Sequence, residues 1–171
     1  MNEATITMLL RLIHILAGIF WVGAIFLIAG FLVPTVRASG PEGGRFMQHL
    51  MLRRRLSMFL LIAMLLTVIS GFTMYGRMVA ATNGAWAGTP PGIGYGLGGL
   101  AALLGAIVGG AISGPAARRM ATIGHQASQG GLSSEQQGEM QRLQRRSALG
   151  SRITAALLAV AAGAMAVARY L

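Results

Sequence analysis

Four long apolar segments alternate along the chain with shorter stretches that hold most of its charged residues. They cover residues 4–36, 56–79, 91–114 and 148–169. Each offers about 20 or more largely apolar residues, the length that a helix needs to cross a hydrocarbon core of about 30 Å. The pattern predicts an all-α integral membrane bundle of four transmembrane helices, which together form a single membrane domain.

Prolines predict where two of these helices begin or end. The first segment is expected to end near Pro34, because proline donates no backbone hydrogen bond. The third is expected to begin after Pro90 and Pro91, since proline suits the first helical turn, and to end at Gly114-Pro115, which resembles a helix stop signal.

The connection between the third and fourth segments divides into two parts. Residues 125–134 are rich in Gly, Ser and Gln and predict a loop. Ser134 stands three residues before Gln137, a spacing that predicts a capping box, so the last helix is expected to begin well before the apolar segment. Glu139 and Arg142 are expected to pair one turn apart on that helix.

Composition supports a membrane location. Only 11% of the residues are charged and 54% are hydrophobic, whereas soluble domains carry about 25% charged residues. The low charge excludes an ordinary soluble enzyme, and the absence of cysteine excludes disulfides and thiolate chemistry. The net charge of +10 is shared among residues at the ends of apolar segments, so nucleic-acid binding is not expected.

The arginines predict an orientation. All fourteen basic residues are Arg, and eleven of them lie in or beside the connections 37–55 and 115–147. By the positive-inside rule these connections face the cytoplasm and both termini face the outer, periplasmic side. We therefore expect a multi-pass protein of a bacterial inner membrane. The residues expected to set this topology and to contact lipid phosphates are Arg53, Arg54, Arg55, Arg118, Arg119, Arg145 and Arg146.

Small residues predict how the helices pack. The third segment carries a stripe of them at spacings of three and four, namely Gly94, Gly98, Ala101, Gly105 and Gly109. The fourth segment repeats the pattern with Ala155, Ala159, Ala162 or Gly163, and Ala166. Membrane helices associate where small residues let backbones approach. The stripe is expected to meet the fourth helix, and a second subunit is the alternative partner.

The first segment contains the side chains best suited to bind a cofactor or to react. Arg11, His14, Gly18 and Trp21 fall at spacings that place them on one helical face. An ionisable residue inside a membrane suggests a function, because its burial is costly. His14 either binds a cofactor or is satisfied by a neighbouring hydroxyl or carbonyl, and the residues alone favour the second interpretation.

A short motif around His14 resembles a known group of proteins. Residues 12–23 read LIHILAGIFWVG, and Arg54-Arg55-Leu56 and Ile69-Ser70-Gly71 follow. Over residues 8–76 this pattern resembles the HemJ-type protoporphyrinogen oxidases and the CopD-like four-helix bacterial membrane proteins. The resemblance implies that His14 is an axial ligand of a b-type haem or a porphyrin, with Trp21 nearby and Arg11 on a propionate.

Two departures weaken what the resemblance implies. HemJ-type proteins are expected to use a lysine on a later helix, and this chain has no lysine. At the expected depth of His14, the other segments place Val68, Ala101 and Val160, none of which ligates iron. The resemblance also raises copper handling, for which Met47, His49 and Met51 are soft donors, with Met74 and Met78 on the other side.

The residues favour a structural role over catalysis. The chain has no Asp, and its four Glu residues all lie outside the membrane interior or at its edge. No phosphate-binding loop, nucleophile elbow or zinc-protease motif occurs. We expect an accessory protein that contacts the lipid bilayer and other membrane-protein subunits, with haem binding and copper handling as alternatives.

Overall fold

The computed structural model describes residues 2–171, apart from the side chains of residue 125 and residues 127–130. The described chain is helical throughout and contains no strand. In chain order its elements are α1 (Glu3–Leu27), the π-helix η1 (Ile28–Leu32), α2 (Val33–Ala38), α3 (Gly40–Gln48), the π-helix η2 (His49–Arg53), α4 (Leu56–Ala81), the 3₁₀ turn η3 (Ala85–Gly88), α5 (Pro90–Val108), the π-helix η4 (Gly109–Ser113), α6 (Gly114–Gly130) and α7 (Ser134–Ala168).

Four continuous helices are long and apolar enough to cross a membrane: Glu3–Ala38, Leu56–Ala81, Pro90–Gly124 and Ser134–Ala168. Their outward faces carry large apolar side chains, including Ile19 at 66% exposure and Phe31 at 69%. A surface of this kind is stable in hydrocarbon and unfavourable in water. The prediction of an all-α fold with four candidate membrane-spanning helices is confirmed.

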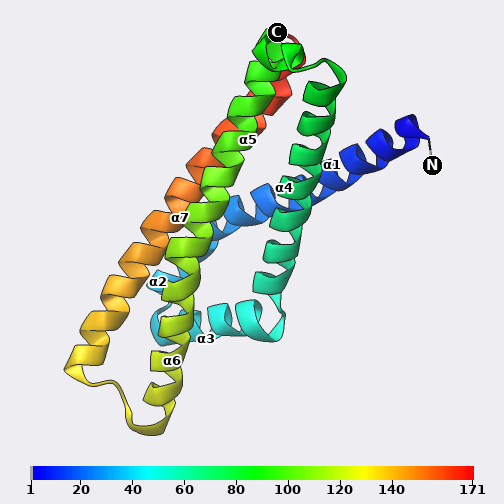
Figure 1. Ribbon diagram of the computed structural model, residues 1–171. Helices are drawn as coiled ribbons and strands as arrows, with labels where there is room; N and C mark the ends of the chain where they lie inside the picture. Colours follow the sequence, from blue (N-terminus) through cyan, green and yellow to red (C-terminus); the bar gives the residue numbers. More distant parts are fainter. Residues whose placement is uncertain (1) are drawn as a thin grey trace.

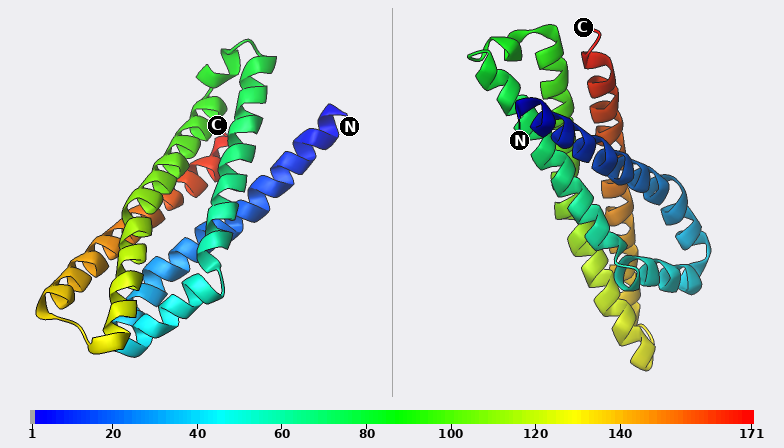
Figure 2. Two further views of the ribbon diagram at one scale, coloured as in Figure 1. Left: turned by 60° about the horizontal axis from the view of Figure 1, so that its bottom comes forward. Right: turned by 90° about the vertical axis from the view of Figure 1, so that its right-hand side faces the viewer.

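The helices pack as two antiparallel pairs. α5 packs along α7 and α1 packs on α4, whereas the contacts between the two pairs are fewer. Figure 1 shows α1 crossing α4 obliquely, while α5 and α7 run side by side. In both views of Figure 2 the two termini lie towards one end of the helices, and α3 and the α6–α7 connection lie towards the other.

The expected helix ends at Pro34 and Pro115 are wrong. The first helix continues past Pro34 to Ala38, and the third continues past Pro115 through α6. Both prolines stand near the start of a helical segment that follows a π turn.

The π turns explain why the prolines are tolerated. Within an α-helix, a proline ring clashes with the carbonyl four residues earlier and leaves it without a donor. Here the residue before each proline donates to the carbonyl five residues back, Val33 to Ile28 and Gly114 to Gly109. The wider turn accommodates the ring without ending the helix.

The predicted loop between the third and fourth helices is much shorter than expected. Helix α6 extends to Gly130, and only residues 131–133 are not helical. The capping box forms one residue earlier than predicted: the Gln136 N–H donates to Ser133 Oγ at 3.2 Å, and the Ser133 N–H donates to Gln136 Oε1 at 3.0 Å. Helix α7 therefore begins well outside the apolar segment, as the sequence indicates.

The ion pair expected between Glu139 and Arg142 is replaced by one between helices. The Arg119 guanidinium in the polar part of α6 donates to both carboxylate oxygens of Glu139 on α7, at 2.7 and 3.0 Å. These hydrogen bonds lower the pKa of Glu139. The two-point contact ties the ends of α6 and α7 together, because a bidentate pair fixes orientation as well as distance.

Two glycines allow the sharp corner that places α3 across the end of the bundle. Gly40 has a φ of +58°, a left-handed conformation that glycine adopts readily. Gly43 lies against the backbone of Val36 and leaves no room for a side chain. From the preceding α2, Arg37 Nη2 donates to the carbonyl of Gln144 on α7 at 2.7 Å. The corner therefore joins the α1–α4 pair to the α5–α7 pair at this end.

The predicted glycine stripe lies against α7 of the same chain. A Cβ at Gly94 would lie 2.8 Å from the Cβ of Ala168, and one at Gly98 would lie 2.8 Å from Met165 Cγ. Further along, Thr154 Oγ1 donates across the interface to the Gly105 carbonyl at 3.4 Å. The backbones approach closely because the stripe has almost no side chains.

The face that α7 offers to this stripe differs from the predicted one. It consists of Thr154, Leu158, Ala161, Met165 and Ala168. Ala155 is also buried, but Ala159, Ala162, Gly163 and Ala166 are exposed on the opposite side. The prediction failed because α7 has small residues on two faces, and a spacing of three or four fits both.

Replacing Gly98 with alanine is expected to destabilise the protein, whereas Gly99→Ala is not. The new Cβ at position 98 would lie 3.2 Å from the Ala161 carbonyl oxygen, but nothing lies within 4 Å of the one at position 99. Overpacking costs about 1–3 kcal/mol, and alanine otherwise favours a helix over glycine by about 1 kcal/mol. Thermal unfolding in detergent measures both variants. Equal shifts would contradict close packing at Gly98.

Candidate functional site

The crossing of α1 over α4 contains the polar residues of the first span. The two backbones approach at Gly18, where an added Cβ would lie 3.5 Å from Thr67 Cγ2. One turn towards the N-terminus, His14 lies over Gly71. The crossing therefore depends on a glycine from each helix, and His14 and Thr67 fill the space between them.

His14 is held by a backbone carbonyl of α4. Its Nδ1 lies 2.8 Å from the Thr67 carbonyl oxygen and 3.4 Å from Ser70 Oγ. A carbonyl oxygen only accepts hydrogen bonds, so Nδ1 carries the proton in this arrangement. The ring approaches because Gly71 has no side chain: a Cβ there would lie 2.8 Å from His14 Cε1 and 3.1 Å from Nδ1.

The hydroxyls next to His14 are used within their own helix. Thr67 Oγ1 donates to the Ala63 carbonyl at 2.7 Å, and Ser70 Oγ donates to the Leu66 carbonyl. Hydroxyls in membrane helices commonly bond back in this way. The hydrogen bond that holds His14 is therefore the one that its Nδ1 donates to the Thr67 carbonyl oxygen, and the longer contact with Ser70 Oγ is weaker.

The other ring nitrogen, Nε2, remains available. With the proton on Nδ1, Nε2 carries a lone pair that can accept a hydrogen bond or bind a metal. Among the side chains that the structure describes, none donates a hydrogen bond to it. Metal-binding histidines are often oriented in this way, with the other ring N–H donated to a backbone carbonyl.

Trp21 packs in the protein core and is only 4% exposed. It forms one cluster with Ala63 of α4, Ala101 and Ala102 of α5, and Leu158 and Ala161 of α7. All four spans meet around this side chain. Trp21 therefore joins the two helix pairs, and its burial leaves no face of it open to a ligand beside His14.

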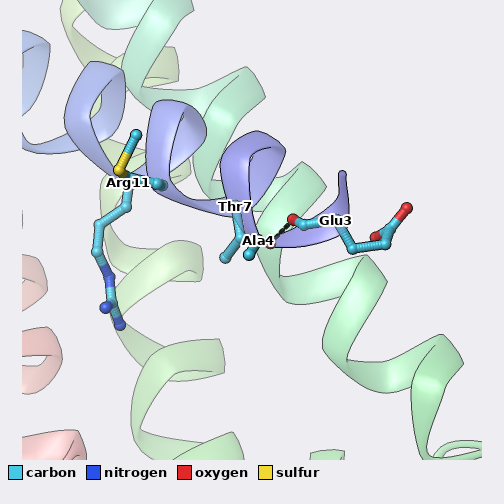
Figure 3. Close-up of a pocket in the computed structure, with 5 residues that line it drawn as sticks. Glu3, Ala4, Thr7 and Arg11 are labelled. Carbon is cyan, nitrogen blue, oxygen red and sulfur yellow. Dashed lines mark hydrogen bonds between the residues drawn. The ribbon is translucent and has the colours of Figure 1, made fainter. Parts of the chain in front are cut away.

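Arg11 is exposed on α1 and does not share the crossing with His14. It lines a shallow hollow on the α1 surface near the N-terminus, together with Glu3, Thr7 and Met8 (Figure 3). Figure 3 shows the side chains of Arg11 and Glu3 extending in different directions. The Glu3 carboxylate instead accepts a hydrogen bond from Arg77 of α4, which joins α1 to α4 near the N-terminus.

The surroundings of His14 fit a porphyrin poorly within one chain. His14 lines neither the hollow near Arg11 nor the hollow near Arg152. Ala101, expected at its depth, is buried in the core, and the Met165 side chain packs on Gly98. Ala101 has no donor atom, and Met165 would have to leave its place against Gly98 to act as a second axial ligand.

The methionine and histidine donors considered for copper do not share a face. His49 is exposed, whereas Met47 and Met51, two residues away on either side, are partly buried. Across the residues described, no group of three or more His, Cys, Asp or Glu side chains is placed to hold a metal ion.

Sequence reasoning identified His14 but missed its partners. Thr67, Ser70 and Gly71 lie at spacings of three and four along α4, so they share a face. A small, polar face on the second span and a histidine on the first are complementary, and this signal could have predicted the crossing. The core position of Trp21 has no such signal, because tryptophan is equally common at membrane interfaces.

In comparisons with known proteins, no protein-family model matches the chain, and neither a curated protein nor a solved structure matches it.

Replacing Gly71 with alanine is expected to weaken the α1–α4 crossing, whereas Gly76→Ala on the same helix is not. The new methyl group would displace the His14 ring and lengthen its bond to the Thr67 carbonyl, but nothing lies within 4 Å of a Cβ at position 76. We expect a loss of about 1–3 kcal/mol for Gly71→Ala. Thermal unfolding in detergent, with the ring ¹⁵N shifts of His14, measures both effects. Unchanged ¹⁵N shifts in Gly71→Ala would refute the contact.

Proposed function

We propose that this protein is a structural subunit of a larger assembly in a bacterial inner membrane and acts through its helix surfaces. The ionisable and aromatic residues of the first span support this role. His14 is bonded to α4, Trp21 fills the junction of the four spans, and Arg11 lies apart from both. Together they stabilise helix packing and do not form a set of reacting groups.

The outer face of α7 carries the proposal. Ala159 and Gly163 are exposed four residues apart, with Ala162 and Ala166 beside them, and no atom lies within 4 Å of a Cβ at Gly163. The inner face of α7 is already occupied by α5. Lipid chains gain little from a flat face of small residues, whereas a partner helix can approach its backbone closely.

The charge distribution supports the proposed orientation. Arg53, Arg54 and Arg55 follow α3, and Arg118, Arg119, Arg145 and Arg146 lie on α6 and α7, all of them exposed. These elements gather at the end of the bundle opposite the two termini (Figure 1). In the proposed topology this end faces the cytoplasm, where the guanidinium groups contact lipid phosphates.

Gly163→Leu is expected to release the protein from its assembly, whereas Gly76→Leu is not. Both glycines have open space around them, so neither leucine meets an atom of the chain at its Cβ. Leucine at position 163 would hold a partner helix away from α7. Blue-native electrophoresis of gently solubilised membranes measures the size of the complex. A wild-type protein that migrates as a 17.8 kDa monomer would refute the proposal.

A b-type haem or porphyrin bound at His14 is the second candidate. The observation that favours it is the orientation of the ring, in which Nδ1 is bonded to a carbonyl and Nε2 is available. His14 lines neither the hollow near Arg11 nor the one near Arg152, so in this candidate the group would lie between His14 and another subunit. The two candidates therefore make opposite predictions for the colour of the protein.

Under the structural proposal, wild-type membranes show no Soret band that depends on this protein, and His14→Gln keeps the fold. Glutamine still offers the Thr67 carbonyl a donor, so we expect a cost of about 1 kcal/mol. Absorbance spectra of unextracted membranes and a pyridine haemochrome assay measure this. A Soret band that His14→Gln abolishes, and that Arg11→Gln weakens less, would overturn the structural proposal in favour of the second candidate.

A further inference from the structure

The second hollow of the molecule lies between the end of the first span and α7, away from the His14 crossing. Its volume is about 300 Å³. Its lining residues are Phe26, Ala29, Gly30, Pro34, Arg152 and Ala155. All of these are apolar or small except Arg152, so the hollow combines a hydrocarbon-like wall with one guanidinium group.

The local sequence explains why a hollow forms here. Gly30 has no side chain, and no atom lies within 4 Å of the position of its Cβ. The π turn η1 widens the first helix at this point, since Val33 donates to the carbonyl of Ile28 five residues back. On the opposite wall Ala155 is small. The hollow therefore results from the wider helical turn together with the small residues Gly30 and Ala155 on its two walls.

Arg152 lacks a partner of opposite charge. Within the described part of the chain, the ion pairs join Arg77 to Glu3 and Arg119 to Glu139, and neither involves Arg152. The helix rises about 25 Å between Arg152 and Arg169 at about 1.5 Å per residue. In a bilayer whose hydrocarbon is about 30 Å thick, Arg152 thus lies near the edge of the hydrocarbon, where its guanidinium can reach lipid phosphates.

We propose that this hollow binds an anionic phospholipid of the cytoplasmic leaflet. Its phosphate pairs with the Arg152 guanidinium, which matches phosphate oxygens in a two-point geometry. Its acyl chain lies along Phe26, Ala29 and Ala155, in the space above Gly30. A lipid is the occupant that joins an anion directly to hydrocarbon, and both features of the hollow require that combination. This site is independent of the proposed contact surface on the outer face of α7.

Two matched pairs of variants test the proposal in the full-length protein. Gly30→Leu fills the hollow, and Gly23→Leu places the same side chain on the same helix in open space outside it. Arg152→Gln removes the cation of the site, and Arg169→Gln removes one from the C-terminal end of α7, away from the hollow. Each protein is reconstituted in vesicles of equal phosphatidylcholine and phosphatidylglycerol, and native mass spectrometry then counts the retained lipids.

We expect the wild-type protein to retain phosphatidylglycerol in preference to phosphatidylcholine. Arg152→Gln should reduce this preference about fivefold, while Arg169→Gln should leave it unchanged. Gly30→Leu should release the lipid and Gly23→Leu should not. If Gly30→Leu does not fold, as thermal unfolding would show, the two arginine variants still decide the question.

Two outcomes would overturn the proposal. The first is equal lipid retention within both matched pairs, because the hollow and Arg152 would then have no role in lipid binding. The second is displacement of the bound phosphatidylglycerol by millimolar inorganic phosphate, since a soluble anion lacks the acyl chain that the apolar wall is proposed to hold. Persistence of the lipid in excess inorganic phosphate supports the lipid assignment.

Discussion

Close approach of backbones at glycine is the interaction on which the rest of the structure depends. Lipid provides no hydrophobic force between helices, so they associate where dispersion contacts and short interhelical hydrogen bonds are available. Along α5 and α7 the backbones approach at Gly94 and Gly98, and across α1 and α4 the glycines make room for side chains of the facing helix, Thr67 at Gly18 and His14 at Gly71. A Cβ at Gly94, Gly98 or Gly71 would lie 2.8 Å from an atom of the facing helix and would force the packed atoms apart.

The two glycine contacts have different consequences because their neighbours differ. On α5 the neighbours are aliphatic, and the interface extends along the helix with one hydrogen bond from Thr154 to the Gly105 carbonyl. On α4 the neighbours are polar and the crossing is oblique, so the contact concentrates around His14. Trp21 then links the pairs, which is why a tryptophan lies in the middle of an otherwise small-residue core. The α1–α4 pair contains the hydrogen-bonded contact of His14, and the α5–α7 pair contains the longer interface.

Much of this architecture could be predicted from the sequence. The four apolar helices follow from hydropathy, and the stripe on α5 follows from its spacing. Helix continuity at Pro34 and Pro115 was not predicted, because a proline in an apolar helix ordinarily indicates a helix end and hydropathy does not reveal the π turns that tolerate these two. The pairing of Glu139 with Arg119 also depends on how α6 folds back along α7. For the candidate site, the position of His14 was evident, but the Thr67 carbonyl is a backbone group and leaves no trace in side-chain patterns.

The π turn η4 gives the two arms of the α6–α7 hairpin different mechanical properties. Helix α7 is continuous from Ser134 to Ala168, about 52 Å at about 1.5 Å per residue, so a force on its polar end reaches Leu158 without a break. The other arm passes through Gly109–Ser113, where the hydrogen-bond ladder changes register and Ser113 Oγ is buried without a hydrogen-bond partner. The hydrogen-bond ladder of the α7 arm is therefore uninterrupted, whereas that of the α5–α6 arm shifts at η4. We expect bending of the hairpin to concentrate at η4, because helices bend where the ladder is interrupted.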